Sequence, residues 1–265
     1  MALDLDRYKA RTARLDVSDL DFTVFRGQPL DAESLRCLRY MHDIEYHTVC
    51  YLRDLLVTAA HKDQTITSFL TIWNFEEFWH GEAIGAVLDM HGERPRDAHI
   101  EEMRRDLGWK DHIAPIAHIV GSKIAGESFL AIHMTWGAIN EWTAQAAYAR
   151  LVARAQHPTL TELLRRIMRD EGRHVDFYAG QAEQRLTNDR RAQWMTRTAL
   201  RRFWSPVGST VMPSAENDFI SHHLFGGPDG RAMTARIDRR IDRLPGLAGL
   251  RLLGGREPAG NNSSW

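Results

Sequence analysis

The sequence contains little cysteine, and both cysteines fall in one segment that we predict to be helical. Only Cys37 and Cys50 occur among 265 residues. A helix rises about 1.5 Å per residue, so the two lie roughly 20 Å apart. Disulfide-bonded residues have Cα atoms within about 7 Å of each other, so these two cannot bridge. We expect reduced, buried thiols without a catalytic role, as in a cytoplasmic protein.

Long apolar runs and an excess of one charge are also missing. Residues 1–16 mix acids with bases, and no uncharged run reaches the roughly 20 residues of a membrane span. The formal net charge is -1, with 26% charged and 43% hydrophobic residues. That composition is typical of a soluble globular protein and lacks the basic excess of a nucleic-acid binder. We therefore expect a cytoplasmic protein with no signal peptide, no membrane contact and no nucleic-acid partner.

Proline and glycine are sparse between residues 31 and 187, and no stretch there alternates with period two. Apolar residues instead recur at steps of three and four, which is typical of amphipathic helices. We predict an all-α fold, in which this region forms the core of a single domain spanning 1–265. The predicted helices are 31–56, 65–90, 97–107, 115–156 and 159–186.

Local signals support these boundaries. Pro115 suits the first turn of a helix, and Thr159 and Glu162 have the spacing of a capping box. On the first helix the expected core-facing residues are Leu38, Met41, Val49, Leu52 and Leu56. On the second and fourth long helices they are Trp73, Ile84, Leu88, Leu160, Leu164, Ile167 and Tyr178.

The region 188–256 is predicted to be a helical extension of the core, followed by a disordered tail at 257–265. Its shorter helices should cover 189–204, 214–225 and 231–244, between prolines and glycines. Arginine is frequent here, which is compatible with a basic face for an acidic partner or with ordinary solvated helix faces. The arginines are Arg190, Arg191, Arg197, Arg201, Arg202, Arg236, Arg239, Arg240 and Arg243.

Two helices carry the same metal-binding pattern. Glu77 and His80 are three residues apart on one, and Glu171 and His174 on the other, so each pair shares a helix face. Burying such groups without partners would cost several kcal/mol each. The two remaining long helices each offer one inward glutamate. The predicted ligands are Glu45, Glu77, His80, Glu141, Glu171 and His174.

Four glutamates and two histidines from four helices form the ligand set of ferritin-like four-helix bundles that hold two irons. Four carboxylates neutralise two mutually repelling cations, and two of them can bridge the ions. By motif position Glu77 and Glu171 are the predicted bridges. Each iron then has one further carboxylate and one imidazole: Glu45 with His80, and Glu141 with His174. Manganese is an alternative metal, because these ligands discriminate weakly.

Other polar residues are less typical of ligands. Glu76 and Glu82 flank the first motif and are expected to point away from the metals and to have ordinary surface roles. Four histidines are more typical of core or surface positions: His42, His47, His118 and His133.

The segments 73–81 and 170–174 resemble the W-x-x-E-E-x-x-H-G and D-E-x-R-H motifs of the soluble acyl-acyl-carrier-protein desaturases, and the similarity covers roughly 40–185. The resemblance implies a homodimeric enzyme that uses two irons, oxygen and electrons from a ferredoxin. It would remove two hydrogens from an acyl chain on acyl carrier protein. Trp73, Asp170 and His80 match the family's electron route. Ala144 stands where the plant enzymes have a threonine.

Three alternative functions use related bundles. Hydroxylation follows from the same ligands as desaturation. N-oxygenation requires an additional histidine one turn before the last motif, where this chain has Ile167. Iron storage without catalysis needs neither the tryptophan and aspartate of the motifs nor the C-terminal helices.

Overall fold

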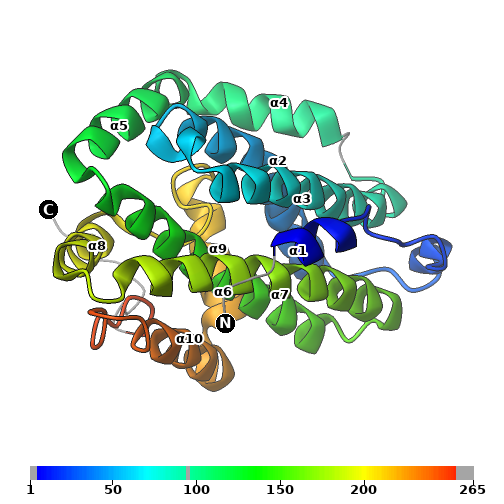
Figure 1. The fold of residues 1–265 in the computed structure, drawn as a ribbon. Coiled ribbons are helices and arrows are strands. Elements are labelled where there is room, and N and C mark those ends of the chain that lie inside the picture. Colours follow the sequence, from blue (N-terminus) through cyan, green and yellow to red (C-terminus); the bar gives the residue numbers. More distant parts are fainter. Residues whose placement is uncertain (1–4, 94–95, 255–265) are drawn as a thin grey trace, which may run out of the picture. The chain divides into compact units, whose positions relative to one another are not determined.

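The structure, a computed structural model, describes residues 5–93 and 96–254 and is all-α (Figure 1). No strand occurs in these ranges, which confirms the predicted all-α class, and the ferritin-like four-helix bundle stays a prediction. The helices are α1 (Leu5–Arg11), α2 (Ala32–Leu56), α3 (Gln64–Met90), α4 (Arg96–Leu107), α5 (Trp109–Ala125), α6 (Ser128–Ala155), α7 (Pro158–Leu186), α8 (Arg190–Phe203), α9 (Ser214–Phe225) and α10 (Gly227–Ile241). Two 3-10 helices, η1 (Phe22–Arg26) and η2 (Ala59–Lys62), complete the set.

The chain divides into two compact units. The first contains Met1–Gly126 and Leu151–His174, and the second contains Glu127–Arg150 and Val175–Trp265. Helices α6 and α7 each contribute residues to both. The prediction of a single domain stays a prediction.

In the first unit, α2 and α3 pack along each other. Figure 1 shows them as neighbouring blue and cyan ribbons. Asp31 caps α2 by accepting from the Ser34 amide at 2.6 Å, and Asp63 caps α3 by accepting from the amides of Thr65 and Ile66. Such caps satisfy amides that lack an intrahelical acceptor. Two long helices are therefore fixed at their starts, with their apolar faces together.

The predicted core stripes are confirmed on α3 and α7 and partly wrong on α2. All seven residues named for α3 and α7 are buried, and so are Leu38 and Met41 on α2. Val49 and Leu56, however, are 44% and 39% exposed, while Leu55 is fully buried. In the second half of α2 the buried face therefore includes Leu55 and not the predicted Val49 and Leu56.

The third of the four long predicted helices, 115–156, is wrong as a single element. The chain forms α5 and α6 instead, and Gly126 between them has φ +58°. Left-handed backbone of this kind favours glycine and ends a helix. Pro115 lies inside α5 and not at a helix start. Five large apolar side chains of α5 are exposed: Trp109, Ile113, Ile116, Val120 and Ile124.

The start of α7 also differs from its prediction. His157 provides the cap, because its carbonyl accepts from the Thr161 amide at 2.8 Å and its Nδ1 from the Leu160 amide at 3.4 Å. Glu162, predicted to complete a capping box, accepts from Arg166 Nε at 3.0 Å. The helix therefore begins at Pro158, one residue before Thr159.

The second unit contains the C-terminal helices. In it Tyr178 packs so closely on α6 that a Cβ added at Gly137 would lie 2.3 Å from the tyrosine ring. Arg197 donates to the carbonyls of Gly246 and Ala248 at 3.2 and 2.9 Å, so this arginine holds the chain after α10. Helix α10 begins four residues earlier than predicted. The predicted tail, 257–265, lies outside the described residues.

The two cysteines should differ sharply in reactivity. Cys37 is fully buried, and burial raises the pKa of its thiol to about 12, whereas Cys50 is half-buried. Because the thiolate is the reactive form, a thiol reagent at pH 8 should label one cysteine per folded chain, at Cys50, and two in denaturant. Mass spectrometry of the labelled peptides checks this, and labelling of Cys37 in the folded protein would contradict the described packing.

Among the described residues, no helix is both long and apolar enough to cross a membrane.

Candidate metal centre

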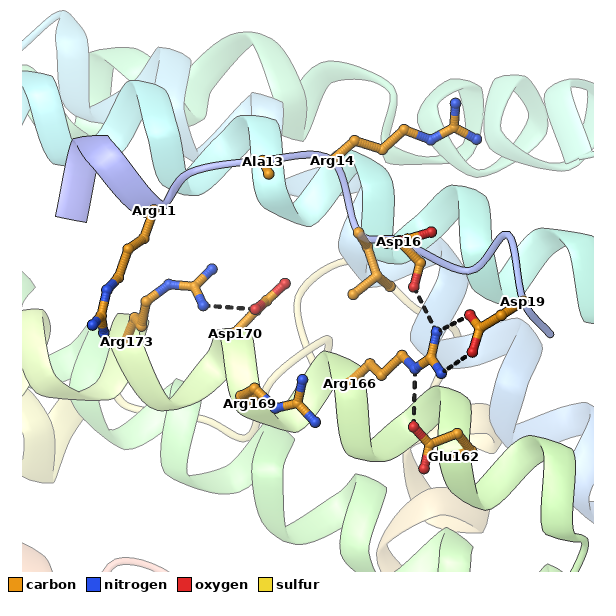
Figure 2. A pocket seen from close by; sticks show the side chains of 11 residues that line it. Arg11, Ala13, Arg14, Asp16, Asp19, Glu162, Arg166, Arg169, Asp170 and Arg173 are labelled. Carbon is orange, nitrogen blue, oxygen red and sulfur yellow. Dashed lines mark hydrogen bonds and ion pairs between the residues drawn. The ribbon is translucent and has the colours of Figure 1, made fainter. Parts of the chain in front are cut away.

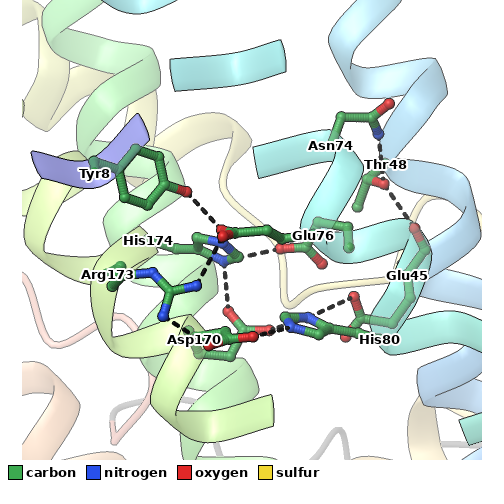
Figure 3. A network of polar contacts seen from close by, with 11 residues as sticks. Tyr8, Glu45, Thr48, Asn74, Glu76, His80, Asp170, Arg173 and His174 are labelled. Carbon is green, nitrogen blue, oxygen red and sulfur yellow. Dashed lines mark hydrogen bonds and ion pairs between the residues drawn. The ribbon is translucent and has the colours of Figure 1, made fainter. Parts of the chain in front are cut away.

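Three helices of the first unit bring five of the six predicted ligands together. Helix α2 supplies one glutamate, and α3 and α7 each supply a glutamate and a histidine one turn apart (Figure 3). Ligand atoms of four of them lie within 4.8 Å of one another: Glu45, Glu77, His80 and Glu171. These four are at most 5% exposed, and His174 is fully buried. The cluster can hold a metal ion.

The two histidines face the carboxylates in the same way. His80 Nδ1 lies 3.3 Å from Glu171 Oε1 and 3.8 Å from Glu45 Oε2. His174 Nδ1 lies 3.1 Å from both Glu77 Oε1 and Glu171 Oε2. Each ring therefore directs Nδ1 toward the cluster, so both can offer the same nitrogen to a metal.

The other nitrogen of each ring meets a carboxylate from the opposite helix. Nε2 of His80, on α3, lies 3.6 Å from Asp170 on α7, and Nε2 of His174, on α7, lies 2.8 Å from Glu76 on α3. A carboxylate behind a histidine fixes the ring orientation and raises its basicity, which is the usual arrangement behind metal-bound imidazole.

His80 provides the test of whether a metal fits. Its ring is fully buried, yet neither nitrogen has a hydrogen-bond partner among the described residues. An unsatisfied buried polar atom costs about 1–3 kcal/mol. A metal bound at Nδ1 would satisfy that atom, and the carboxylates at 3.3 and 3.8 Å are the right companions for a cation. The residues present therefore fit a metal ion, although they do not select one metal.

The electrostatics agree with this fit. Burial, together with the negative charges of Glu45 and Glu171, holds the pKa of Glu77 well above its ordinary value. Burial alone would lower the pKa of His80, but the carboxylates of Asp170 and Glu171 outweigh it and raise the pKa to about 9. Neighbouring negative charge contributes to both pKa shifts, and a bound cation would neutralise that charge.

Glu141, the sixth predicted ligand, lies on α6 in the second unit. Its carboxylate is buried, with 6% exposure. Its role as a ligand stays a prediction.

The surface role expected for Glu76 is wrong, because this residue is buried behind His174, on the side of the ring away from the cluster. Its side chain is 1% exposed and accepts three hydrogen bonds: from Tyr8 Oη at 2.7 Å, Arg173 Nη2 at 2.7 Å and His174 Nε2 at 2.8 Å. Burial alone would raise the pKa of Glu76, but these donors outweigh it and hold the pKa below its ordinary value. Glu76 is thus a buried carboxylate that orients His174. Glu82 is partly exposed and accepts from the Tyr46 hydroxyl.

The expected electron route includes two residues that are not proposed ligands, Asp170 and Trp73. Their positions relative to His80 differ. Asp170 is held by Arg173 Nη1 at 2.7 Å and reaches the His80 ring. Trp73 is buried on α3 two turns before His80, with its ring 6.0 Å from that of Tyr51. The structure brings Asp170 to His80, and the part of Trp73 in electron transfer stays a prediction.

Tyr8 was not found by sequence reasoning. It lies on the seven-residue α1, which is too short for a periodic pattern, and its ring packs 5.6 Å from Phe69 on α3. Its burial raises the pKa of its hydroxyl, so Tyr8 stays a hydrogen-bond donor to Glu76 at neutral pH.

Three of the four histidines not expected to bind metal have the following neighbours, and their absence from the ligand set stays a prediction. His42 lies 3.0 Å from Asp43, and His118 hydrogen-bonds the Ala114 carbonyl at 2.8 Å. His133 packs against Phe129, with ring centroids 4.3 Å apart.

Gly81, directly after His80, lets α2 approach α3. A Cβ there would lie 2.6 Å from the Tyr46 ring, which is held by Glu82 and by the Phe78 ring 5.6 Å away. Gly81→Ala should therefore lower the free energy of unfolding by about 1–3 kcal/mol through overpacking.

Urea unfolding measures this effect. Gly121→Ala is the matched control, because nothing lies within 4 Å of its Cβ position on α5. It should raise stability by up to about 1 kcal/mol. Equal effects of the two substitutions would show that Gly81 is not needed for close packing.

Comparisons of the chain with protein-family models, curated proteins and solved structures found no match.

Proposed function

We propose that the chain is a di-iron, oxygen-dependent oxidoreductase that acts on an acyl substrate as a desaturase. The buried cluster of carboxylates around the His80 ring carries the proposal. Burying a charged side chain without a compensating partner costs several kcal/mol. A buried group of carboxylates is therefore typical of a metal site, where the bound cations compensate the negative charge. The proposed ligands are Glu45, Glu77, His80, Glu141, Glu171 and His174.

The protein's own residues hold and orient the site. The carboxylates of α2, α3 and α7 would neutralise bound cations. Glu76 orients the His174 ring through a hydrogen bond, and the carboxylate of Asp170 lies 3.6 Å from the His80 ring. Iron bound there would supply oxygen activation, for which amino-acid side chains have no suitable redox chemistry. The burial of the cluster keeps bulk water from the reacting groups.

The choice of an acyl chain as substrate rests on the resemblance of 73–81 and 170–174 to the desaturase motifs. In desaturation the acyl chain loses two hydrogens with their electrons, the donor supplies two further electrons, the solvent supplies two protons, and one oxygen molecule becomes two waters. A ferredoxin is the proposed donor, and two copies of the chain form the proposed assembly.

We propose that the acyl substrate is attached to an acidic acyl carrier protein. Four arginines of α8 are exposed, which suits an acidic partner: Arg190, Arg191, Arg201 and Arg202. Arg197 is not part of this group, since it holds two backbone carbonyls.

The test begins with anaerobic loading of ferrous iron and a count of iron per chain. About two irons per chain and an oxo-bridged ferric absorption spectrum after exposure to oxygen are expected. The loaded protein is then given reduced ferredoxin, oxygen and acyl carrier proteins charged with saturated chains of different lengths. Mass spectrometry should detect a product lighter by two hydrogens.

The mass of the product distinguishes desaturation from hydroxylation and from iron storage. A gain of one oxygen atom would replace desaturation by hydroxylation, and oxidised iron without any change of substrate would favour storage. Absence of stoichiometric metal from the loaded protein would overturn the di-iron proposal altogether.

A further inference from the structure

Helix α5, in the first unit, presents an apolar face to solvent. Its five large apolar side chains are 46–70% exposed, and an alanine between them is exposed as well. At 100° per residue all six side chains fall within about 100° of arc on one side of the helix. We call them the α5 face: Trp109, Ile113, Ile116, Ala117, Val120 and Ile124.

The opposite side of α5 packs against α2. His118 lies on that side, and its Nδ1 is 3.8 Å from Asp54 Oδ2 on α2. The contact with α2 therefore fixes the rotation of α5 about its own axis, so the α5 face is directed away from α2.

The size of the α5 face is that of an interaction site. At these exposures it leaves on the order of 600 Å² of apolar surface to solvent, the upper end of the largest patch on a typical monomer. A standard interface buries roughly 800 Å² on each partner. The α5 face alone supplies most of that area.

The cavity along α7 differs from the α5 face, because its charges have partners within the chain. It has a volume of about 420 Å³ and lies between the segment after α1 and α7 (Figure 2). Arg166 holds Asp19 at 2.6 and 2.8 Å and Glu162 at 3.0 Å, and Arg173 holds Asp170 at 2.7 Å. The apolar side chains of α5, in contrast, remain in contact with solvent.

The α5 face has nearly the same order of residues in both directions along the helix. Its members form pairs at equal distances from the midpoint between 116 and 117: Trp109 with Ile124, Ile113 with Val120, and Ile116 with Ala117. In a twofold interface between identical copies, residue i contacts residue j of the partner as j contacts i. An antiparallel second α5 would therefore place an apolar residue opposite every residue of the face.

We propose that the α5 face binds the α5 face of a second copy of this chain, antiparallel, about a twofold axis near Ile116 and Ala117. The six side chains are uncharged, so identical copies meet there without repulsion between like charges. The inference rests on the two-copy assembly of the proposed function and gives that assembly a surface. It does not depend on the iron chemistry, because the proposed ligands lie on other helices.

Sedimentation equilibrium of the full-length protein tests the proposal. The wild type should be a dimer at micromolar concentration. Trp109→Glu and Ile116→Glu should each raise the dimer dissociation constant about 30-fold or more, as for loss of a central interface residue. Both positions are exposed, so the helical content should stay that of the wild type. Phe203→Glu is the matched control, because Phe203 on α8 is 71% exposed and Trp109 is 69% exposed. It should leave the dissociation constant unchanged.

Disulfide cross-linking tests the antiparallel arrangement. In a Cys50→Ser background, Ile116→Cys should link two copies on oxidation, because this position lies beside the proposed axis. Ile124→Cys should not, since the two copies of that position would be roughly 20 Å apart along the helices, beyond the reach of a disulfide. Cross-linking at Ile124→Cys and not at Ile116→Cys would overturn the antiparallel pairing.

Three other results would overturn the proposed surface. They are a monomeric wild type, a dimer unaffected by both glutamate variants of α5, and an equal loss in Phe203→Glu. Binding of a monomeric wild type to phosphatidylcholine vesicles would assign the α5 face to lipid instead. Iron counted on the same proteins separates this proposal from the proposed function. The monomeric α5 variants should bind as much iron as the wild type, whereas a dimer without iron would contradict only the di-iron proposal.

Discussion

The Glu171→Ala protein is expected to bind ferrous iron more than about 100-fold more weakly than the wild type. Loss of a residue that only orients a ligand already costs about 10- to 100-fold in metal affinity. A larger loss is expected for Glu171, because it lies between the two histidines: its two oxygens are 3.3 Å from His80 Nδ1 and 3.1 Å from His174 Nδ1. Anaerobic competition with a chelator of known affinity measures the change.

Two further proteins make this result interpretable. Glu183→Ala removes an exposed glutamate of the same helix and should bind iron like the wild type. Glu171→Gln keeps the side-chain volume and removes the charge, so it should also lose affinity if charge is what matters. Wild-type affinity in both Glu171 variants, with the helical content retained, would show that α7 does not contribute this carboxylate to a metal site.

Glu76→Ala should cost about 3–5 kcal/mol in the free energy of unfolding of the metal-free protein. Removing one partner of a buried ion pair leaves the other charge without compensation, which typically costs this much. Here three donors lose their acceptor at once: the Tyr8 hydroxyl, the Arg173 guanidinium and the His174 ring. Urea unfolding in the presence of a chelator measures the loss apart from any effect of metal.

The control for Glu76 lies on the same helix. Glu82→Ala removes the acceptor of the Tyr46 hydroxyl at a partly exposed position and should cost about 1 kcal/mol. Glu76→Gln retains one acceptor oxygen and should fall between the two alanine variants. A loss at Glu76 no larger than that at Glu82 would show that the buried network does not contribute to stability.

Sequence reasoning succeeded where the relevant spacing is local. The faces of α3 and α7 are determined by residues three or four positions apart, so Glu77 and His80 could be placed together before any tertiary information. That they meet Glu171 then followed from the expectation that both faces are buried.

The orientation of Glu76 could not be obtained in this way. It is adjacent to Glu77, and adjacent helix residues point about 100° apart. Whether that direction is solvent or protein depends on which side α7 and α1 approach. Tyr8, Arg173 and His174 come from those two helices, and no pattern within 73–81 reports on them.

Helix ends were missed for a different reason. Glycine inside a helix costs only about 1 kcal/mol relative to alanine, so Gly126 was compatible with a continuous helix over 115–156. Its φ of +58° is a property of the folded chain. The cap of α7 was similarly missed, because the ring of His157 was not among the side chains expected to cap a helix.

The network around Glu76 also determines when the site can form. Tyr8 and Glu76 are separated by 68 positions, and Glu76 and Arg173 by 97. Closing loops of this length carries an entropy cost that early local structure does not repay. During synthesis, the proposed ligands of α7 follow that of α2 by on the order of ten seconds. Until α7 arrives, Glu76 and Glu77 remain on a helix that cannot bury them at low cost, so a metal ion held by this cluster would enter only after α7 has packed.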